Sequence, residues 1–270
     1  MDRLTDKLSR LERRLGALES AVVAYSGGVD SAFLAVVCRR ALGDRMAAAL
    51  GVSPSVARRE MVDALRVARD FGIPLREIPT REMDNPLYVA NRPDRCFHCK
   101  DELFGALGDW ARTDGFRWVL DGTHLDDQED DRPGRRAAAA HGVRSPLLEM
   151  GWTKDDIREG ARDLGIAIWD KPSSPCLASR IPHGSAVRIE SLGRIERAEE
   201  SIRALGFRDL RVRAHGDLAR IELMREDISR LLDEGLRQRV LEAAREAGFE
   251  EAALDATGYR RAGASAGGDP

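Results

Sequence analysis

One short segment, SGGVDS at residues 26–31, constrains this chain more than any other feature. It follows the apolar run 21–25 and precedes a helical pattern of apolar residues, so it lies at a turn between a strand and a helix. Two glycines let the backbone approach a ligand closely, and successive N–H groups at a helix start bind anions. Because Ser26 and Ser31 can add hydroxyl donors, the segment predicts a phosphate-binding loop.

A carboxylate inside this loop needs an explanation, because Asp30 would repel phosphate. The conflict disappears if Asp30 helps to hold a Mg²⁺ ion that bridges the phosphates of the ligand. The simpler alternative is a tight turn in which Gly27 and Gly28 only allow the bend. The segment does not have the Walker spacing and lacks the Walker lysine.

Strands and helices alternate along the first 175 residues. The apolar patterns indicate strands at residues 21–25, 46–52, 75–78 and 117–121, and helices at 4–18, 55–71, 101–111 and 153–164. This alternation predicts an α/β fold whose parallel sheet carries helices on both faces. We therefore expect a first domain over residues 1–175 that contains the phosphate-binding loop.

The pattern changes near residue 180. The sequence then indicates a helix at 189–205, strands at 210–214 and 219–224, a helix at 226–248 and a last strand at 252–259. We expect these elements to form a smaller α+β domain over residues 176–260. Residues 261–270 are rich in Gly and Ala and are predicted to be a disordered tail.

Charge and hydropathy exclude several classes of protein. The chain has 43 basic and 46 acidic residues and a net charge of −3, whereas a nucleic-acid binder usually carries a basic surplus. No apolar run is long enough to span a membrane, and the charged N-terminus lacks the apolar segment of a signal peptide. We expect a cytoplasmic protein with neither a nucleic acid nor a membrane as its partner.

Four cysteines remain to be placed. In a reducing compartment, the Cys96-x-x-Cys99 pair and the distant Cys176 are better candidates for catalysis or metal binding than for disulfides. Alternatives are a zinc site with His98 as a further ligand, or a redox CxxC. Cys38 lies in an apolar helical pattern and is predicted to be a buried core residue.

Five motifs together carry a resemblance to a known family. They are SGGVDS, RCFHCK (95–100), DGTHLDD (121–127), DRPG (131–134) and WDKPSSPCLASRIP (169–182). SGGVDS resembles the PP-loop of the adenine nucleotide alpha-hydrolase class, which grips the pyrophosphate released when ATP donates AMP. The full set resembles the LarE family, and the likeness continues through LRVRAH and ARIEL at 210–215 and 219–223.

The resemblance implies a reaction. LarE family members use ATP to adenylate a carboxylate of pyridinium-3,5-biscarboxylic acid mononucleotide and convert it to a thiocarboxylate, for the nickel-pincer cofactor. Some members sacrifice the sulfur of the cysteine in the CLASR motif. Others resemble tRNA thiolases that hold a 4Fe–4S cluster on three cysteines. Here we favour a cluster on Cys96, Cys99 and Cys176, with sacrifice of Cys176 as the alternative route.

The predicted site includes further residues from several segments. Asp121 and Thr123 follow a predicted strand, where open α/β sheets bind ligands, and Asp126 and Asp127 are candidates for Mg²⁺ or ATP. The predicted residues for the adenylate or the substrate phosphate are Lys171, Ser179 and Arg180. Asp30 and Cys176 are the predicted catalytic residues.

A basic strand completes the prediction. Arg211 and Arg213 are one residue apart and therefore share a strand face, and with Arg194 they are expected to bind the phosphate and second carboxylate of the substrate. A solvated basic face is the alternative. We further expect a separate sulfide donor and a homo-oligomer. A tRNA thiolase with the same loop and a three-cysteine cluster is the main alternative function.

Overall fold

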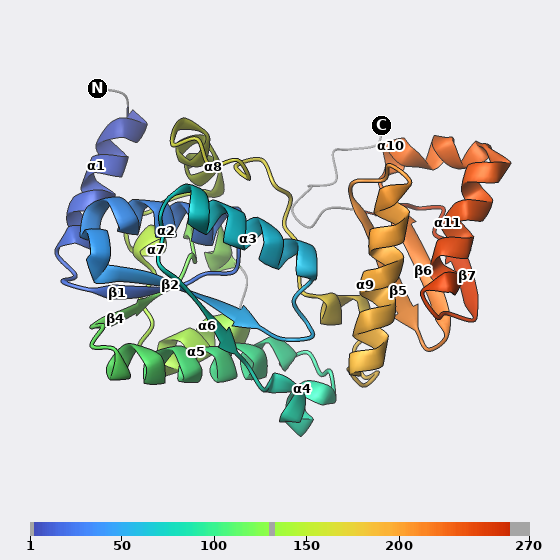
Figure 1. Ribbon diagram of the computed structural model, residues 1–270, viewed down its shortest axis with the longest axis horizontal. Helices are drawn as coiled ribbons and strands as arrows, with labels where there is room; N and C mark the ends of the chain where they lie inside the picture. Colours follow the sequence, from blue (N-terminus) through green and yellow to red (C-terminus); the bar gives the residue numbers. More distant parts are fainter. Residues whose placement is uncertain (1–2, 130–132, 260–270) are drawn as a thin grey trace. The chain divides into compact units, whose positions relative to one another are not determined.

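The structure is a computed structural model that describes residues 3–129 and 133–259. Asp131 and Arg132 of the DRPG motif and the predicted tail at 261–270 lie outside these residues. The chain divides into two compact units (Figure 1). The first unit contains Met1–Tyr88 and Pro93–Ser174, and the second contains Val89–Arg92 and Pro175–Pro270.

A four-stranded parallel sheet forms the centre of the first unit. Its order is β3-β2-β1-β4, and its strands are β1 (Ala21–Ala24), β2 (Met46–Val52), β3 (Leu75–Pro79) and β4 (Trp118–Leu120). All four residues of β1 are buried, as expected for a central strand covered on both sides. The predicted α/β fold with a parallel sheet is confirmed.

Helices cover both faces of this sheet (Figure 1). Val23 packs into one hydrophobic core, whereas Val22 and Ala24 pack into the other, because successive strand residues point to opposite faces. The first core is formed with α1 (Arg3–Gly16), α2 (Val29–Leu42), α3 (Arg58–Asp70) and α8 (Lys154–Asp163). The second is formed with α5 (Arg95–Thr113) and α6 (Pro133–Ala140).

Helix α5 begins six residues earlier than the sequence suggested. It starts at Arg95 rather than at residue 101, so both cysteines of the CxxC pair lie on the helix. The charged segment 95–101 hides this start, because the apolar positions that pack into the core, Phe104, Leu107 and Trp110, come later. Shorter elements that were not predicted include α4 (Pro86–Val89), α7 (Pro146–Glu149), η1 (Gly43–Arg45), η2 (Glu82–Asp84) and η3 (Leu125–Glu129).

The second unit is built on a three-stranded sheet of order β5-β6-β7. Strands β5 (Leu210–His215) and β6 (Leu218–Leu223) form an antiparallel hairpin, and β7 (Glu251–Leu254) lies parallel to β6. The long helices α9 (Ile189–Ala204) and α11 (Glu234–Glu246) pack with the sheet, and η4 (Leu177–Arg180) precedes α9. This confirms the smaller α+β C-terminal part.

The predicted helix at 226–248 is interrupted. It consists of α10 (Arg225–Ile228), η5 (Ser229–Leu232) and α11. The break falls at Asp233, whose backbone is extended and whose side chain accepts a 2.8 Å hydrogen bond from the Leu236 N–H as the cap of α11. The predicted last strand also ends early, because a turn held by Asp255 and Thr257 follows β7.

A short segment from earlier in the chain belongs to the second unit. Asn91 in Val89–Arg92 is fully buried, and its amide donates to the carbonyls of Ile181, Pro182 and Ser185. These bonds fix the loop that follows the CLASR motif. The segment therefore contributes to the structure around Cys176, although it precedes α5 in the sequence.

Candidate functional site

The SGGVDS loop joins β1 to α2 in a conformation that requires its first glycine. Gly27 has φ +75°, and a Cβ atom there would lie 2.7 Å from the Ala64 Cβ and 3.0 Å from the Glu60 carbonyl oxygen. Gly28 has φ −79° and meets no such obstacle. Within the loop, the Ser26 N–H donates to the Ser31 hydroxyl at 3.1 Å. The loop is thus closed by hydrogen bonds between its own residues.

A cavity of about 320 Å³ lies beside the loop, at the carboxyl ends of β1 and β4. It is lined by Ala24, Ser26, Asp30, Ser31, Lys100, Phe104, Asp121, Gly122, Thr123, Asp127, Gly134 and Arg135. Ligands of open α/β sheets bind at this edge. The structure therefore brings the loop together with three residues predicted from the DGTHLDD motif: Asp121, Thr123 and Asp127.

Gly122 allows the loop and the end of β4 to touch. A Cβ atom on Gly122 would lie 2.9 Å from the Ser31 backbone nitrogen. Beside it, Asp121 accepts hydrogen bonds from the Thr123 hydroxyl at 2.9 Å and the Ser145 hydroxyl at 2.7 Å. The hydrogen bond between Thr123 and Asp121 therefore fixes both side chains at the wall of the cavity.

Lys154 is a residue of this site that the sequence analysis missed. Its Nζ lies 2.5 and 2.7 Å from the two carboxylate oxygens of Asp30, so the charge in the loop is already neutralised by the protein. The Lys154 backbone is fixed as well, since its N–H donates to Asp126 at 2.6 Å at the start of α8. The sequence predicted only a helix over residues 153–164 here, and a helix start by itself does not mark a ligand site.

A buried histidine lies among the acidic residues of the same region. The Nε2 of His124 is 3.8 Å from Asp30 and 3.5 Å from Asp127, and its Nδ1 is 3.8 Å from Asp126. The His124 backbone N–H donates to Asp127 at 3.1 Å. Asp126 and Asp127 thus organise the turn after β4.

Lys171, which was predicted to bind the adenylate or the substrate phosphate, pairs with two carboxylates of the protein. Its ammonium group binds Glu60 at 2.8 Å and Asp63 at 2.7 Å on α3, and it does not line the loop cavity. Burial, with a further contribution from Asp63 on the same helix, raises the pKa of the Tyr25 phenol just after β1. The contacts of Lys171 attach the WDKP segment to α3.

The CxxC pair and the loop cavity share helix α5. Cys96 is exposed and Cys99 is half-buried, one helical turn apart, and the next residue, Lys100, lines the cavity. All four cysteines lie in described parts of the chain and all are thiols. Burial raises the pKa of the Cys38 thiol, which packs in the core behind the loop.

No metal centre is assembled in the described structure. Across residues 3–129 and 133–259, the His, Cys, Asp and Glu side chains form no group of three or more placed to hold a metal ion. Cys96 and Cys99 belong to the first unit, whereas Cys176 belongs to the second.

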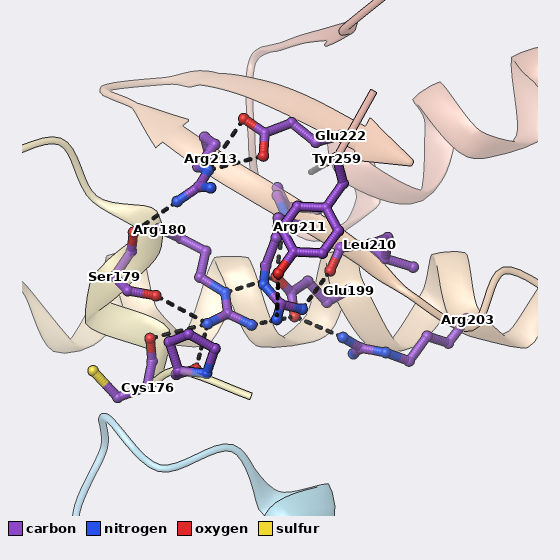
Figure 2. Close-up of polar contacts among 12 residues, drawn as sticks. Cys176, Ser179, Arg180, Glu199, Arg203, Leu210, Arg211, Arg213, Glu222 and Tyr259 are labelled. Atoms are coloured by element: carbon purple, nitrogen blue, oxygen red, sulfur yellow. Dashed lines mark hydrogen bonds and ion pairs between the residues drawn. The ribbon is translucent and has the colours of Figure 1, made fainter. Parts of the chain in front are cut away.

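Arg180 is buried beside Cys176 in the second unit (Figure 2). Only 2% of it is exposed. Its Nε and Nη2 donate to Glu199 at 2.9 and 3.2 Å, and its Nη1 donates to the Cys176 carbonyl at 3.0 Å and to the Pro175 carbonyl. Burial alone would raise the pKa of Glu199, but Arg180 and Arg203 lower it overall.

Arg211 and Arg213 do share one face of the β5–β6 hairpin with Glu222 (Figure 2). Arg213 binds both carboxylate oxygens of Glu222 at 3.1 Å, and its Nη1 donates to the Ser179 carbonyl at 2.9 Å. Arg211 is 6% exposed, donates to the Tyr259 hydroxyl at 3.3 Å and stacks on that ring. Burial and the nearby Arg180 lower the pKa of Arg211.

The structure does not bring Arg194 to this pair. Arg194 binds Asp217 at 2.8 Å and the Gly248 carbonyl at 3.2 Å, at the turn that follows β5. A strand advances by about 3.3 Å per residue, so this turn is about 10 Å along the strand from Arg213 and about 16 Å from Arg211. Arg194 fastens α9 to the hairpin turn.

Comparisons with known proteins cover nearly the whole chain. The family model described as NAD synthase matches residues 1–97. An uncharacterized protein of Synechocystis is 41% identical over 257 residues, 95% of this chain and 96% of the relative. The pyridinium-3,5-bisthiocarboxylic acid mononucleotide synthase of Lactiplantibacillus plantarum is 32% identical over 261 residues, 96% of this chain and 94% of that protein.

The chain belongs to the LarE family. Its membership confirms the resemblance carried by the five motifs and makes the chain an ATP-dependent sulfurtransferase. A weaker similarity, 23% over 222 residues, links it to the tRNA-specific 2-thiouridylase MnmA of Clostridioides difficile and covers 66% of this chain and 60% of that protein. Among the described residues of this LarE family member, no helix is long and apolar enough to cross a membrane.

Proposed function

We propose that this LarE family protein adenylates a carboxylate of pyridinium-3,5-biscarboxylic acid mononucleotide and converts it to a thiocarboxylate, with release of AMP and pyrophosphate. The observation that carries the proposal is the closed SGGVDS loop beside a cavity of about 320 Å³, in a chain aligned over 96% of its length with a synthase of the bisthiocarboxylic product. The substrate class comes from that relative.

Adenylation is assigned to the loop cavity. An oxygen of the substrate carboxylate attacks the α-phosphorus of ATP, the bond from that phosphorus to the bridging oxygen breaks, and pyrophosphate leaves with the electron pair. The loop N–H groups and the hydroxyls of Ser26 and Ser31 would stabilise the charge on the departing pyrophosphate. Lys154 would keep the carboxylate of Asp30 from opposing that charge, because it binds both of its oxygens.

A magnesium ion belongs to the same proposal. Asp30 and Asp127 line the cavity, and carboxylate oxygens are ligands that Mg²⁺ accepts. Bound there, the ion would neutralise the triphosphate.

Sulfur transfer is assigned to Cys176. In the sacrificial route, the Cys176 thiolate attacks the carbonyl carbon of the acyl adenylate and AMP leaves with the oxygen that came from the carboxylate. A base then removes the Cα proton of Cys176, and the Cβ–S bond breaks. This elimination leaves dehydroalanine in the chain and the sulfur on the substrate, with no external reductant.

A 4Fe–4S cluster on Cys96, Cys99 and Cys176 is the route that we favour. Two thiols one turn apart at the start of α5 suit two ligands, and Cys176 would supply the third. When bound, such a cluster would supply sulfide from its fourth iron, so the chain would keep its own sulfur. Anaerobic iron and sulfide analysis of wild type and Cys176→Ala distinguishes the routes.

The arginine face of β5 is proposed as the holder of the substrate's phosphate or second carboxylate. Arg211 and Arg213 project from one face, and guanidinium groups can bind a carboxylate or a phosphate through two hydrogen bonds. Ser179 lies next to this face, because its carbonyl accepts from Arg213. The contacts of Lys171 and Arg194 support structural roles for those two residues.

A tRNA thiolase is the alternative function. The similarity to MnmA favours it, but that match covers only 60% of the thiouridylase, and the net charge of −3 gives no basic surplus for RNA. A separate sulfide donor and a homo-oligomeric assembly remain part of our proposal, and sedimentation analysis would measure the assembly.

The test of the proposed function is pyrophosphate release from ATP in three parallel reactions, with the pyridinium biscarboxylate mononucleotide, with unmodified tRNA, and with neither. We expect release only with the mononucleotide. Release that requires tRNA would replace our proposal with the thiolase, and release with neither acceptor would leave no support for a specific carboxylate substrate.

A further inference from the structure

The Arg180 side chain reaches in two directions from one buried position. On one side, Nε and Nη2 bind the Glu199 carboxylate, and on the other side Nη1 binds the carbonyls of Pro175 and Cys176. A guanidinium group is planar and presents its donors in a fixed fork. The guanidinium group therefore holds the two sets of acceptors at a fixed separation. Figure 2 shows its contacts with both sets.

Glu199 continues this connection to the sheet. Its Oε1 also accepts a 3.2 Å hydrogen bond from the Val212 N–H, and Val212 lies on β5 between Arg211 and Arg213. A second connection runs the other way, since Arg213 donates to the Ser179 carbonyl at 2.9 Å. Two independent bridges thus join the CLASR segment to the strand that bears the arginine pair.

We infer that Arg180 is a positioning residue, which together with Glu199 fixes the Cys176 main chain relative to β5. The inference rests on the proposed function, in which Cys176 takes part in sulfur transfer and the arginine pair holds the substrate. It replaces the expectation that Arg180 itself binds a phosphate, because a guanidinium that is 2% exposed and directed at Glu199 and two carbonyls is engaged with the protein.

Sulfur transfer requires the Cys176 main chain to be held in a defined position. Sulfur must approach a carbonyl carbon to about 3–3.5 Å, and a displacement of about 1 Å can cost about 100-fold in rate. Cys176 lies directly before η4 in a segment without regular secondary structure, where its carbonyl accepts one backbone hydrogen bond, from the Ser179 N–H at 2.9 Å, and further restraint has to come from a side chain. The Arg180 guanidinium supplies that restraint.

The test compares two substitutions on the same carboxylate. Arg180→Lys keeps a positive charge for Glu199, but a single ammonium group cannot also reach the carbonyls of Pro175 and Cys176. Arg203→Lys is the matched control, since Arg203 binds the same carboxylate at 2.8 Å and has no bond to the Cys176 segment. Substrate-dependent pyrophosphate release and thiocarboxylate formation are measured separately in single turnovers, below the thermal transition of each protein.

We expect Arg180→Lys to slow thiocarboxylate formation by about 100-fold while pyrophosphate release stays within about twofold of wild type. Arg203→Lys is expected to leave both steps within about twofold. If Arg180→Lys does not fold, Arg180→Gln, which keeps a donor without the charge, should show the same selective loss.

Two results would overturn the inference. One is wild-type thiocarboxylate formation in a folded Arg180 variant. The other is an equal loss in Arg203→Lys, which would make the Glu199 network a matter of stability alone. A wild-type protein that releases no pyrophosphate with the mononucleotide contradicts the proposed function instead, so the two failures are distinguishable.

Discussion

The loop site of the first unit and the arginine cluster of the second unit offer different kinds of hydrogen-bond donor to an anion. The loop uses backbone N–H groups and small hydroxyl side chains around an open cavity of about 320 Å³. The cluster uses long guanidinium groups that protein carboxylates and carbonyls already hold in place. The donors of the loop face a cavity that a charged ligand can enter. The guanidinium groups of the cluster are already engaged with protein acceptors, and these contacts fix the geometry of the cluster.

This difference fits two kinds of step. Adenylation needs stabilisation of a highly charged leaving group, which N–H donors and a cation provide. Sulfur transfer needs two reacting atoms held at a short distance, which a rigid ion-pair network provides. We therefore expect substitutions in the two units to have separable effects.

The largest expected effect separates the two steps at Cys176. Cys176→Ala should lower thiocarboxylate formation by at least about a thousandfold, because the sulfur-bearing group is lost, while substrate-dependent pyrophosphate release persists. Cys38→Ala is the matched control and should keep both activities, since Cys38 is buried in the core behind the loop. Loss of pyrophosphate release in Cys176→Ala would show that the two steps are not separable.

The next effect concerns the charge at the centre of the arginine cluster. Glu199→Gln should destabilise the second unit by about 3 kcal/mol at pH 7, because buried Arg180 loses its counter-charge. The control is Glu190→Gln, on the exposed part of the same helix. Hydrogen exchange of the β5 amides, including the Val212 N–H that donates to Glu199, measures the change by mass spectrometry.

The pH dependence gives this prediction a sign. The pKa of Glu199 is lowered from its ordinary value of 4.5, so its contribution to stability is fully present above that value and is lost as the pH falls through the lowered pKa. Wild type and Glu199→Gln should therefore converge in stability on acidification. A difference in the free energy of unfolding between wild type and Glu199→Gln that stays constant down to about pH 3 would contradict the ion-pair explanation.

A smaller effect is expected from the two loop glycines. Gly27→Ala should lower the free energy of unfolding of the first unit by about 2 kcal/mol, because φ is positive and the new Cβ meets Ala64 and the Glu60 carbonyl. Gly28→Ala should change it by less than about 0.5 kcal/mol. Fluorescence of Trp152, buried in the core of this unit, follows the unfolding. Equal costs would show that the loop tolerates either residue.

The smallest effect tests the cation beside the loop. Lys154→Gln should slow pyrophosphate release by about tenfold, because the carboxylate of Asp30 would then face the departing phosphates without its partner. The control Lys7→Gln removes a bond to Asp156 on the same helix α8 and leaves the loop unchanged. Release at the wild-type rate in Lys154→Gln would exclude Lys154 from the adenylation site.

Much of the fold could be predicted because its signals are local. The apolar runs that became β1 and β2 and the glycines that end helices lie within a few residues of the features they specify. The start of α5 was missed, because the charged segment before Asp101 hides a helix whose apolar face begins later. The break at Asp233 was missed because a single capping residue interrupts an otherwise helical pattern.

The site was predictable where it depends on one segment. The loop and the residues after β4 meet because neighbouring parallel strands end at the same edge. Lys154 was invisible, since it reaches Asp30 from 124 residues away. The settings of Lys171, Arg180 and Arg194 were also invisible, because a sequence shows that an arginine or lysine is present but not which carboxylate it binds.

The central claim is that this protein activates a carboxylate with AMP before it transfers sulfur. The most direct measurement uses the pyridinium biscarboxylate mononucleotide labelled with ¹⁸O in its carboxylates, ATP and a sulfide source, with mass analysis of the nucleotide products. The account predicts one ¹⁸O atom in the phosphate of AMP and none in pyrophosphate. Formation of ADP, or of AMP without the label, would contradict it.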